Sequence, residues 1–496
     1  MKKTLFAIAA MALTCMTTLR AVAETRYATI ASNDVPFNMP QVALPDIPDR
    51  TVNLKDFGAT GDGGTLCTEA FAKAMKALSA QGGGRLIVPA GIWFTGPIQF
   101  ENNTELHLEQ GALILFTADY DAYPEVETVY EGNTAKKKMS PLWAYEKHDV
   151  AITGHGAIDA QGQFWRPSKR GKFTDAQWKE LTSGRGIEHK NVWYPDARQD
   201  EKAGRKGQPD LRRVTYRPTL LEFTRCQRVL LQDVTLSNSP AWNTHPLMCE
   251  DVTIDRVTIR NPWFAQNGDG LDLESCNRCV IKNSTFDVGD DAICIKSGKD
   301  KEGRSWKRPC QNVVIEGCTV LHGHGGFVIG SEMSSGARNI YVNNCLFNGT
   351  DTGLRMKSTR GRGGVVEDIY INNINMVNIA GEAFTFSLYY ANKPVAGKHD
   401  SESSASDAVP AVSEETPCFR KLRISNIVCQ GAKQAVFFNG LPEMPLSDVV
   451  IENSLFVCER GANMSYAKDI TFRNVKIDNR QGERIEMQDV KDFKEE

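Results

Sequence analysis

A spacing of 22 residues between two similar segments constrains this chain more than any other feature of its sequence. The segment NGDGLDLES (residues 267–275) aligns with GDDAICIKS (residues 289–297), so that Asp269 matches Asp291. If each repeat is one turn of a parallel β-solenoid, equivalent residues of successive turns stack about 4.8 Å apart. The spacing therefore predicts a stacked pair of carboxylates, and the adjacent Asp290 supplies a third acid.

The repeat occurs nine times from residue 226 onward, with apolar residues at its fourth, sixth and eleventh positions. Asparagine tolerates the left-handed backbone that a corner between two strands requires. The eighth position is asparagine in six of the nine repeats: Asn283, Asn344, Asn373, Asn426, Asn453 and Asn474. We therefore predict an all-β fold, in which residues 49–496 form a single domain built as a parallel β-helix.

Three segments of this domain depart from the repeat. Residues 68–78 place Phe71, Met75 and Leu78 on one face of a helix, which predicts a short N-terminal helix capping the open end of the solenoid. An insertion near residues 163–217 carries 14 Lys and Arg against 7 Asp and Glu, and several Trp and Tyr. We interpret it either as a solvated loop or as a basic, aromatic wall for an anionic ligand. A second insertion near residues 392–417 has the composition of a surface loop.

The N-terminus has the pattern of a secretory signal. Residues 1–23 contain two lysines, a short apolar run and an Ala-Val-Ala sequence, which predicts cleavage near Ala23 and a lead-in over residues 24–48. We therefore expect an exported protein, either periplasmic or secreted. Lipidation at Cys15 is the alternative, and the apolar run is too short for a membrane span.

Composition and cysteine placement exclude several other classes. A net charge of -3 gives no support to nucleic-acid binding. Cys226, Cys249, Cys276 and Cys310 all occupy the first position of a repeat, which favours buried thiols over disulfides. Cys276 and Cys279 form a CxxC pair, but no second pair completes a zinc site. We therefore predict neither a metal nor a cofactor.

Two later segments, HGGFVIGS and DTGLRMKS, continue the alignment of the acidic repeats. His324 falls on the Asp290 position, and Lys357 falls on the Lys296 position. Because side chains alternate along a strand, Asp290, His324, Arg355 and Lys357 should share the outward face. One strip of the surface would then carry an acid, an imidazole, a guanidinium and an ammonium group.

Asp269 and Asp291 have the opposite parity, which points them inward. Burying bare carboxylates is costly. We therefore expect each strand to begin just after its aspartate, with the neighbouring glycines permitting a bend.

These motifs resemble, in order, those of glycoside hydrolase family twenty-eight, the polygalacturonases, and the pattern is most similar to bacterial exo-acting members. The resemblance covers roughly residue 56 to the C-terminus, with Gly268 and Met356 as small departures from the family pattern. It implies a right-handed parallel β-helix. The motifs are Asn-Gly-Asp at 267–269, Gly-Asp-Asp at 289–291, Gly-His-Gly at 323–325 and Arg-Met-Lys at 355–357.

The resemblance also implies roles for the clustered residues in an inverting hydrolysis. Asp290 would be the general acid, Asp269 and Asp291 would hold the attacking water, and His324 would tune the acid. The residues themselves agree, because three clustered carboxylates cannot all ionise and a general acid must carry a proton. Arg355 and Lys357 suit a uronate carboxylate. Further candidates for substrate binding are Lys296, His245 and Tyr389.

The expected substrate is a pectic polysaccharide cut at α-1,4-galacturonosidic bonds by a monomeric enzyme. The insertions predict exo-action from the non-reducing end, because either of them could close one end of the groove. Rhamnogalacturonan or xylogalacturonan are alternative substrates. A calcium-dependent pectate lyase and a non-catalytic adhesin or tailspike-like solenoid are alternative classes.

Overall fold

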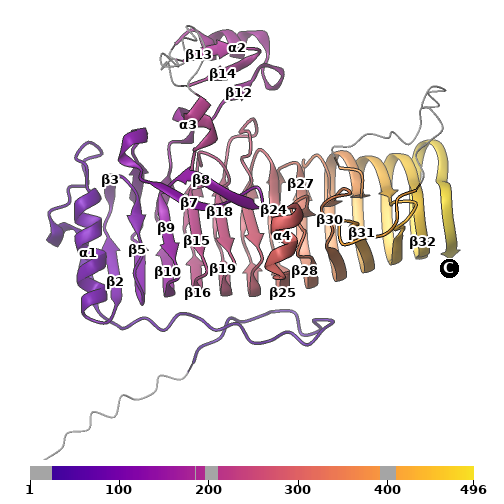
Figure 1. The fold of residues 1–496 in the computed structure, drawn as a ribbon, viewed down its shortest axis with the longest axis horizontal. Helices are drawn as coiled ribbons and strands as arrows, with labels where there is room; N and C mark the ends of the chain where they lie inside the picture. The colour runs from indigo at the N-terminus through magenta and orange to yellow at the C-terminus, as the bar shows by residue number, and fades with distance from the viewer. Residues whose placement is uncertain (1–24, 185, 196–210, 391–408) are drawn as a thin grey trace, which may run out of the picture.

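The computed structural model describes residues 25–184, 186–195, 211–390 and 409–496, which form one elongated parallel β-helix (Figure 1). A single sheet of 27 strands winds around the axis, and its strands pair in parallel between successive turns. The predicted fold class is therefore confirmed. The signal peptide and most of the second insertion lie outside the described residues and stay predictions.

The strands fall into three columns. The first column contains β4 (Ile98–Gln99), β9 (Leu142–Tyr145), β15 (Leu221–Thr224), β18 (Thr244–Leu247), β21 (Leu271–Glu274), β24 (Asp291–Lys296), β27 (Gly325–Gly330) and β29 (Leu354–Lys357). The second contains β1 (Thr51–Asn53), β2 (Gly84–Val88), β5 (Thr104–Leu108), β10 (His148–Gly154), β16 (Gln227–Gln232), β19 (Glu250–Asp255), β22 (Asn277–Lys282), β25 (Cys310–Glu316) and β28 (Ala337–Asn348). The third contains β3 (Gly91–Thr95), β6 (Ala112–Phe116), β11 (Ala157–Asp159), β17 (Thr235–Ser237), β20 (Thr258–Arg260), β23 (Thr285–Asp287) and β26 (Thr319–His322).

The last turns run as long strands that continue around the corners. These are β30 (Val365–Ser387), β31 (Cys418–Asn439) and β32 (Leu446–Glu495). Each pairs in parallel with the preceding turn over most of its circumference, apart from a few bulged positions.

Left-handed residues mark the corners. All six predicted asparagines have φ between 48° and 56°, and the Asn474 side chain donates to Asn453 Oδ1 at 2.9 Å, one turn away. The asparagine corner is therefore confirmed. The third position of each repeat is also left-handed, from Arg228 (φ 53°) to Asp469 (φ 54°), and this second corner was not predicted because its residue types vary.

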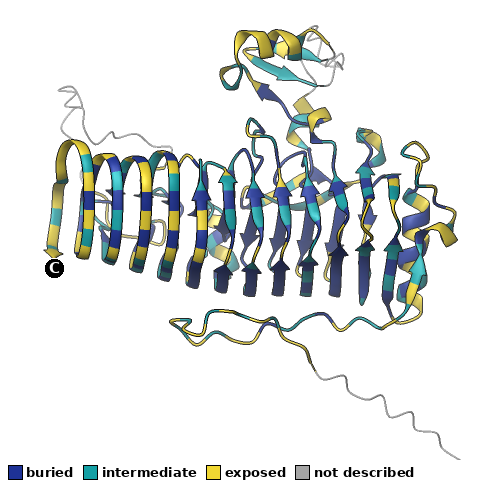
Figure 2. Cartoon of the chain, turned by 180° about the vertical axis from the view of Figure 1, so that it is seen from behind, coloured by how far each residue is buried: buried dark blue, intermediate teal, exposed yellow. Residues whose placement is uncertain are grey.

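The interior of the solenoid is one continuous apolar core (Figure 2). It includes stacked aromatics such as Phe386 and Phe438, whose ring centroids lie 4.9 Å apart. All twelve cysteines beyond the predicted signal peptide are buried and free, as predicted. Backbone amides even donate to their sulfurs, as Cys226 does to Cys249 Sγ at 3.4 Å.

The predicted capping helix is confirmed as α1 (Thr68–Ala80), which lies at the first turn and buries Phe71, Met75 and Leu78 (Figure 1). The lead-in runs along the outside of the solenoid towards the C-terminal turns and then doubles back to the first turn. It is held by carboxylates on successive turns; for example, Glu316 accepts from the Ala31 amide at 2.6 Å.

Two groups of elements lie outside the solenoid wall. The first insertion contains β12 (Ser168–Lys169), α2 (Asp175–Thr182), β13 (Ile187–His189), β14 (Val192–Tyr194) and α3 (Leu211–Thr215), and it rises from one edge of the first column (Figure 1). The second group is an unpredicted antiparallel hairpin of β7 (Glu125–Tyr130) and β8 (Asn133–Lys138), which runs across that column towards α4 (Asp300–Trp306). No helix among the described residues has the length and apolar character needed to cross a membrane.

Candidate active site

The first strand column brings the predicted site residues together. Asp272 pairs with Cys294, Val328 pairs with Arg355, and Gly330 pairs with Lys357 in the ladders from β21 to β29. This register confirms the alignment of the repeats. Arg355 and Lys357 consequently reach back along the axis towards Asp291.

The three aspartates lie at the beginning of β21 and β24. Asp269 is 3% exposed and Asp291 is 1% exposed, whereas the Asp290 side chain is 22% exposed. The expectation that both inward aspartates escape burial was wrong, because Asp291 is itself the first residue of β24. Its charge is stabilised by Lys357, whose Nζ lies 2.6 Å from Oδ2, and by Arg355 at 3.5 Å.

The two buried aspartates, Asp269 and Asp291, differ in the direction in which their pKa values are shifted. Burial would raise the pKa of Asp291, but the positive charges of Lys357, Arg355 and Lys296 lower it to about 2. Burial, together with the charges of Asp272 and Asp290, raises the pKa of Asp269 well above its usual range. The pKa values of the two buried aspartates are therefore shifted in opposite directions, which favours the ionised form of Asp291 and the protonated form of Asp269.

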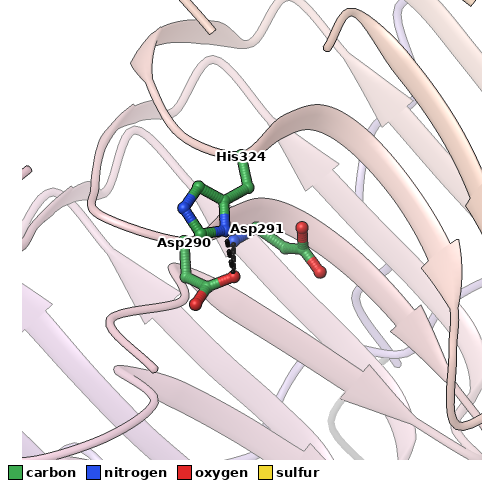
Figure 3. A group of neighbouring side chains, drawn as sticks. All are labelled: Asp290, Asp291 and His324. Carbon is green, nitrogen blue, oxygen red and sulfur yellow. Dashed lines mark hydrogen bonds and ion pairs between the residues drawn. The ribbon is translucent and has the colours of Figure 1, made fainter. Parts of the chain in front are cut away.

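His324 contacts the accessible aspartate (Figure 3). Its Nδ1 lies 2.9 Å from Asp290 Oδ1, and its Nε2 lies 3.8 Å from Asp351. The hydrogen bond to Asp290 raises the pKa of His324 despite partial burial. The backbone supports this contact, because the His324 amide donates to the Asp290 carbonyl at 2.8 Å.

A cation could in principle use the same three side chains. Donor atoms of Asp290, Asp291 and His324 lie within 4.8 Å of one another. However, Asp291 is already neutralised by Lys357, and His324 is hydrogen-bonded to Asp290. A divalent ion would have to compete with these positive groups, so the donor set fits a metal poorly.

The other predicted substrate ligands lie below the surface or to one side. Lys296 is 3% exposed and is held by Glu332 at 2.9 Å and Asp272 at 3.5 Å. His245 is fully buried and its Nε2 lies 2.9 Å from Glu274. Both side chains are held by buried carboxylates, and their part in substrate binding stays a prediction.

The third of these candidates, Tyr389, packs against Arg360, whose guanidinium lies 5.4 Å from the ring centroid. The neighbouring Tyr390 lies at the site, with Lys357 Nζ 5.2 Å from its ring centroid. The sequence selected Tyr389 and not Tyr390 as a candidate for substrate binding, and the role of Tyr389 stays a prediction.

Several functional neighbours were missed from the sequence. Asp272 is fully buried, and burial raises its pKa to about 7 although Lys296 opposes that shift. Its alternation with Leu271 and Leu273 was the signal that could have placed it on the outward strip. Glu332 follows the GHG segment in a loop and had no such signal.

The β7–β8 hairpin covers the strip on the N-terminal side of the aspartates. The Tyr130 ring packs on Trp242 at 4.7 Å, and Trp242 in turn contacts His245 at 5.1 Å. Thr134, near the hairpin turn, donates its amide to Glu302 of α4 at 2.9 Å. This cover explains why His245 and Lys296 are buried although they point outward.

The fold and site together define an enzyme of the β-helix type that uses carboxylates for acid–base chemistry. Residues 200–410 match the family model described as glycosyl hydrolases family 28. The chain is 30% identical to an exo-poly-α-D-galacturonosidase of Dickeya chrysanthemi over 69% of this chain and 58% of that protein. It is 28% identical to a probable polygalacturonase of Vitis vinifera over 82% of this chain and 74% of that protein.

A solved structure agrees over nearly the whole length. The exopolygalacturonase of Thermotoga maritima has 33% identity and a TM-score of 0.73, covering 89% of this chain and 95% of that one. The chain belongs to glycosyl hydrolase family 28, and it is a glycoside hydrolase. This membership decides against the lyase and the non-catalytic solenoid as classes.

Proposed function

We propose that this enzyme hydrolyses α-1,4-galacturonosidic bonds of polygalacturonate with inversion at the anomeric carbon. The observation that carries the proposal is the pairing of an ionised, buried Asp291 with an accessible Asp290 in hydrogen-bond contact with His324. Inverting hydrolysis requires one carboxylate that takes a proton from water and one carboxylic acid that protonates the leaving oxygen. The two adjacent aspartates differ in burial and in their partners, and we assign these two roles to them on that basis.

Asp291 acts as the base in this proposal. Its pKa of about 2 keeps it ionised at any pH well above 2, so it can accept a proton from the attacking water. Asp269, whose raised pKa favours the protonated form, orients that water instead of deprotonating it. Asp290 protonates the glycosidic oxygen, and His324 holds its carboxyl group in place.

The charge of the site supports a uronate substrate. Arg355 is 24% exposed and lies 3.5 Å from Asp291, so part of its guanidinium remains available to a sugar carboxylate beside the cleaved bond. The names of the Dickeya chrysanthemi and Thermotoga maritima relatives specify galacturonosidase activity. Rhamnogalacturonan and xylogalacturonan remain the alternative substrates, and a product chromatogram on each polymer distinguishes them.

We further propose exo-action from the non-reducing end. The β7–β8 hairpin crosses the outward face on one side of the aspartates, and it is fixed at both its base and its tip. A polymer chain lying along the strip would meet the Tyr130 and Trp242 rings there. The substrate would therefore enter from the other side and present its terminus.

Viscosity and reducing ends on polygalacturonate test this directly. The wild type should release monomer or dimer first, with a slow loss of viscosity. Replacing residues 126–137 by a short glycine-rich turn should open the groove and speed the loss of viscosity per bond cut. A ladder of mixed oligomers from the wild type would contradict exo-action while leaving hydrolysis intact.

A further inference from the structure

A pocket at the far end of the first strand column lies apart from the catalytic aspartates, and we call it the corner pocket. Arg225 and Met248, which line it, directly follow β15 and β18, whereas Asp291 begins β24. Because the strands of this column are parallel, the pocket and the aspartates lie at opposite ends of the strands. Its volume of about 340 Å³ falls within the range of about 300–1,000 Å³ that is typical of ligand sites. Its lining also includes Gln227, Glu250, Trp306 and Arg308.

Helix α4 supplies one wall of the corner pocket through Trp306, its last residue. The helix lies against the outside of the solenoid (Figure 1), and two glycines permit this close approach. A Cβ atom at Gly303 would lie 2.3 Å from the Gly298 carbonyl carbon, and one at Gly298 would lie 2.6 Å from the Trp306 ring. The indole therefore packs against the turn that follows β24, which fixes its position.

The backbone fixes the orientation of Arg308. Its Nε donates to the Ser275 carbonyl at 3.1 Å, and its Nη2 donates to the Met248 carbonyl at 3.0 Å. Nη2 also donates to Glu250 Oε1 at 3.1 Å, and Glu250 in turn pairs with Arg278 at 2.8 Å. One carboxylate is thus shared between two guanidinium groups. Nη1 of Arg308 has no hydrogen-bond partner within the described part of the chain, so its N–H groups remain to donate to a ligand.

Arg225 brings a second positive charge to the corner pocket. Its side chain is 56% exposed, and its ion pair with the equally exposed Glu146 is 3.9 Å long. A pair this long between exposed groups contributes little stability, so Arg225 can turn to a ligand at low cost. The lining side chains carry two positive charges, Arg225 and Arg308, against one negative charge, Glu250. The corner pocket therefore favours an anion.

The combination of an indole with two guanidinium groups indicates the class of this anion. A guanidinium group pairs with a carboxylate through two parallel hydrogen bonds. The indole of Trp306 offers an apolar face to a sugar ring, and the amide of Gln227 can hydrogen-bond to sugar hydroxyl groups. An inorganic anion would use the arginines and leave the indole without a contact. A uronate sugar uses all of these groups.

We propose that the corner pocket binds a galacturonate unit of a pectic chain, outside the groove in which the chain is cut. This inference rests on the proposed function and extends it by a second site for the same class of substrate. A chain that is held at two places has a raised effective concentration at each of them. The enzyme would therefore stay on the polymer between successive cuts, an advantage that short oligomers held in the groove alone do not receive.

Titration calorimetry of the inactive Asp290→Asn variant with trigalacturonate tests the inference. We expect two binding events per protein chain, one in the groove and one in the corner pocket. Adding Arg225→Asn should weaken the second event roughly 10-fold, as expected for the loss of a hydrogen bond to a charged group. The first event should be unchanged. Asparagine suits this position because the backbone of Arg225 is left-handed, with φ 53°.

Arg256→Asn is the matched control for this substitution. Arg256 has φ 54° and is 48% exposed, and it lies outside the corner pocket. Trp306→Ala is an independent variant, because it removes the indole and keeps both arginines; it should also weaken the second event. Galactotriose, which has no carboxylate, should bind to the corner pocket much more weakly than trigalacturonate does.

Activity provides a second readout, which a purely structural role would not divide by chain length. In the otherwise wild-type enzyme, Arg225→Asn should lower kcat/KM on polygalacturonate and leave it unchanged on trigalacturonate. A single binding event in Asp290→Asn, or a second event that neither Arg225→Asn nor Trp306→Ala weakens, would overturn the inference. Equal affinity of the second event for galactotriose would overturn it as well. If the wild type does not hydrolyse polygalacturonate but the second event persists, only the proposed function is overturned.

Discussion

Lys357 Nζ lies 2.6 Å from Asp291 Oδ2 although the two residues belong to strands two turns apart in the solenoid, with β27 between them. The two side chains are 9% and 2% exposed, so little solvent screens the pair. The same lysine that the sequence assigned to substrate recognition therefore also sets the ionisation of the proposed base. The ion pair between Lys357 and Asp291 therefore links recognition of the substrate carboxylate to activation of the water.

Removing this lysine should change the pH dependence of catalysis. Lys357→Met raises the pKa of Asp291 from about 2, because its strongest stabilising charge is lost. The base must be ionised, so the acid-side decline of kcat should begin at higher pH in the variant. A kcat profile across the acid range measures this shift, and Lys301→Met, an exposed substitution in α4, serves as the control. Superimposable acid limbs would exclude Asp291 as the base.

Asp290→Asn should abolish hydrolysis and keep the fold. The amide has the shape of the carboxyl group but cannot deliver a proton to the leaving oxygen, so kcat should fall by at least about 10²-fold. Asp287→Asn, at the end of β23, is the matched control, since Asp287 contacts His322 outside the site. Circular dichroism and the melting temperature establish that both variants fold. Normal turnover by folded Asp290→Asn would remove its assignment as the acid.

Arg355→Ala should weaken binding of galacturonate chains more than binding of methyl-esterified chains. Esterification removes the negative charge with which the guanidinium would pair, so the penalty should shrink on the esterified substrate. Lys357→Ala should show the same preference, in addition to its effect on Asp291. KM for both polymers measures the difference. Equal penalties would mean that these residues do not read the carboxylate.

Lys296→Met should destabilise the fold. It removes the cation that Glu332 and the fully buried Asp272 share, and leaves Glu332 with only the more distant Arg362 at 3.9 Å. Breaking a buried ion pair costs about 3–5 kcal/mol. Lys296 holds the pKa of Glu332 well below its usual range against the effect of burial. Without Lys296 that pKa rises, so the loss of stability should shrink as the pH falls and the carboxylates become protonated.

Denaturant unfolding at two pH values checks this prediction. Adding Glu332→Gln to Lys296→Met should recover part of the lost stability, because the amide removes one of the two buried carboxylates that paired with the lysine. If Lys296→Met instead keeps full stability and changes only KM, the lysine contacts the substrate after all.

The repeat made much of this site predictable. A fixed spacing stacks equivalent positions, so Asp269, Asp291, His324 and Lys357 could be placed relative to one another from the sequence. The asparagine corners followed from the same periodicity because one residue type suits their backbone. These features depend on contacts between neighbouring turns.

The covering elements were not predictable in this way. Tyr130 belongs to a hairpin outside the repeat, and its packing on Trp242 joins residues more than a hundred positions apart in the sequence. That contact decides that Lys296 and His245 are buried. The burial of Asp291 was missed for a related reason, since its compensating charge comes from Lys357, two strands further along the column.

The buried cysteines of the core can be used to measure which turn of the solenoid opens first. Cys226, Cys249, Cys276 and Cys310 mark successive turns, and Cys458 lies in the last strand, all of them buried and free. A thiol reagent can reach each one only when its own turn separates from its neighbours. Because the stability of a repeat fold is a sum of local units and their interfaces, labelling followed by peptide mapping would show at which end unravelling starts.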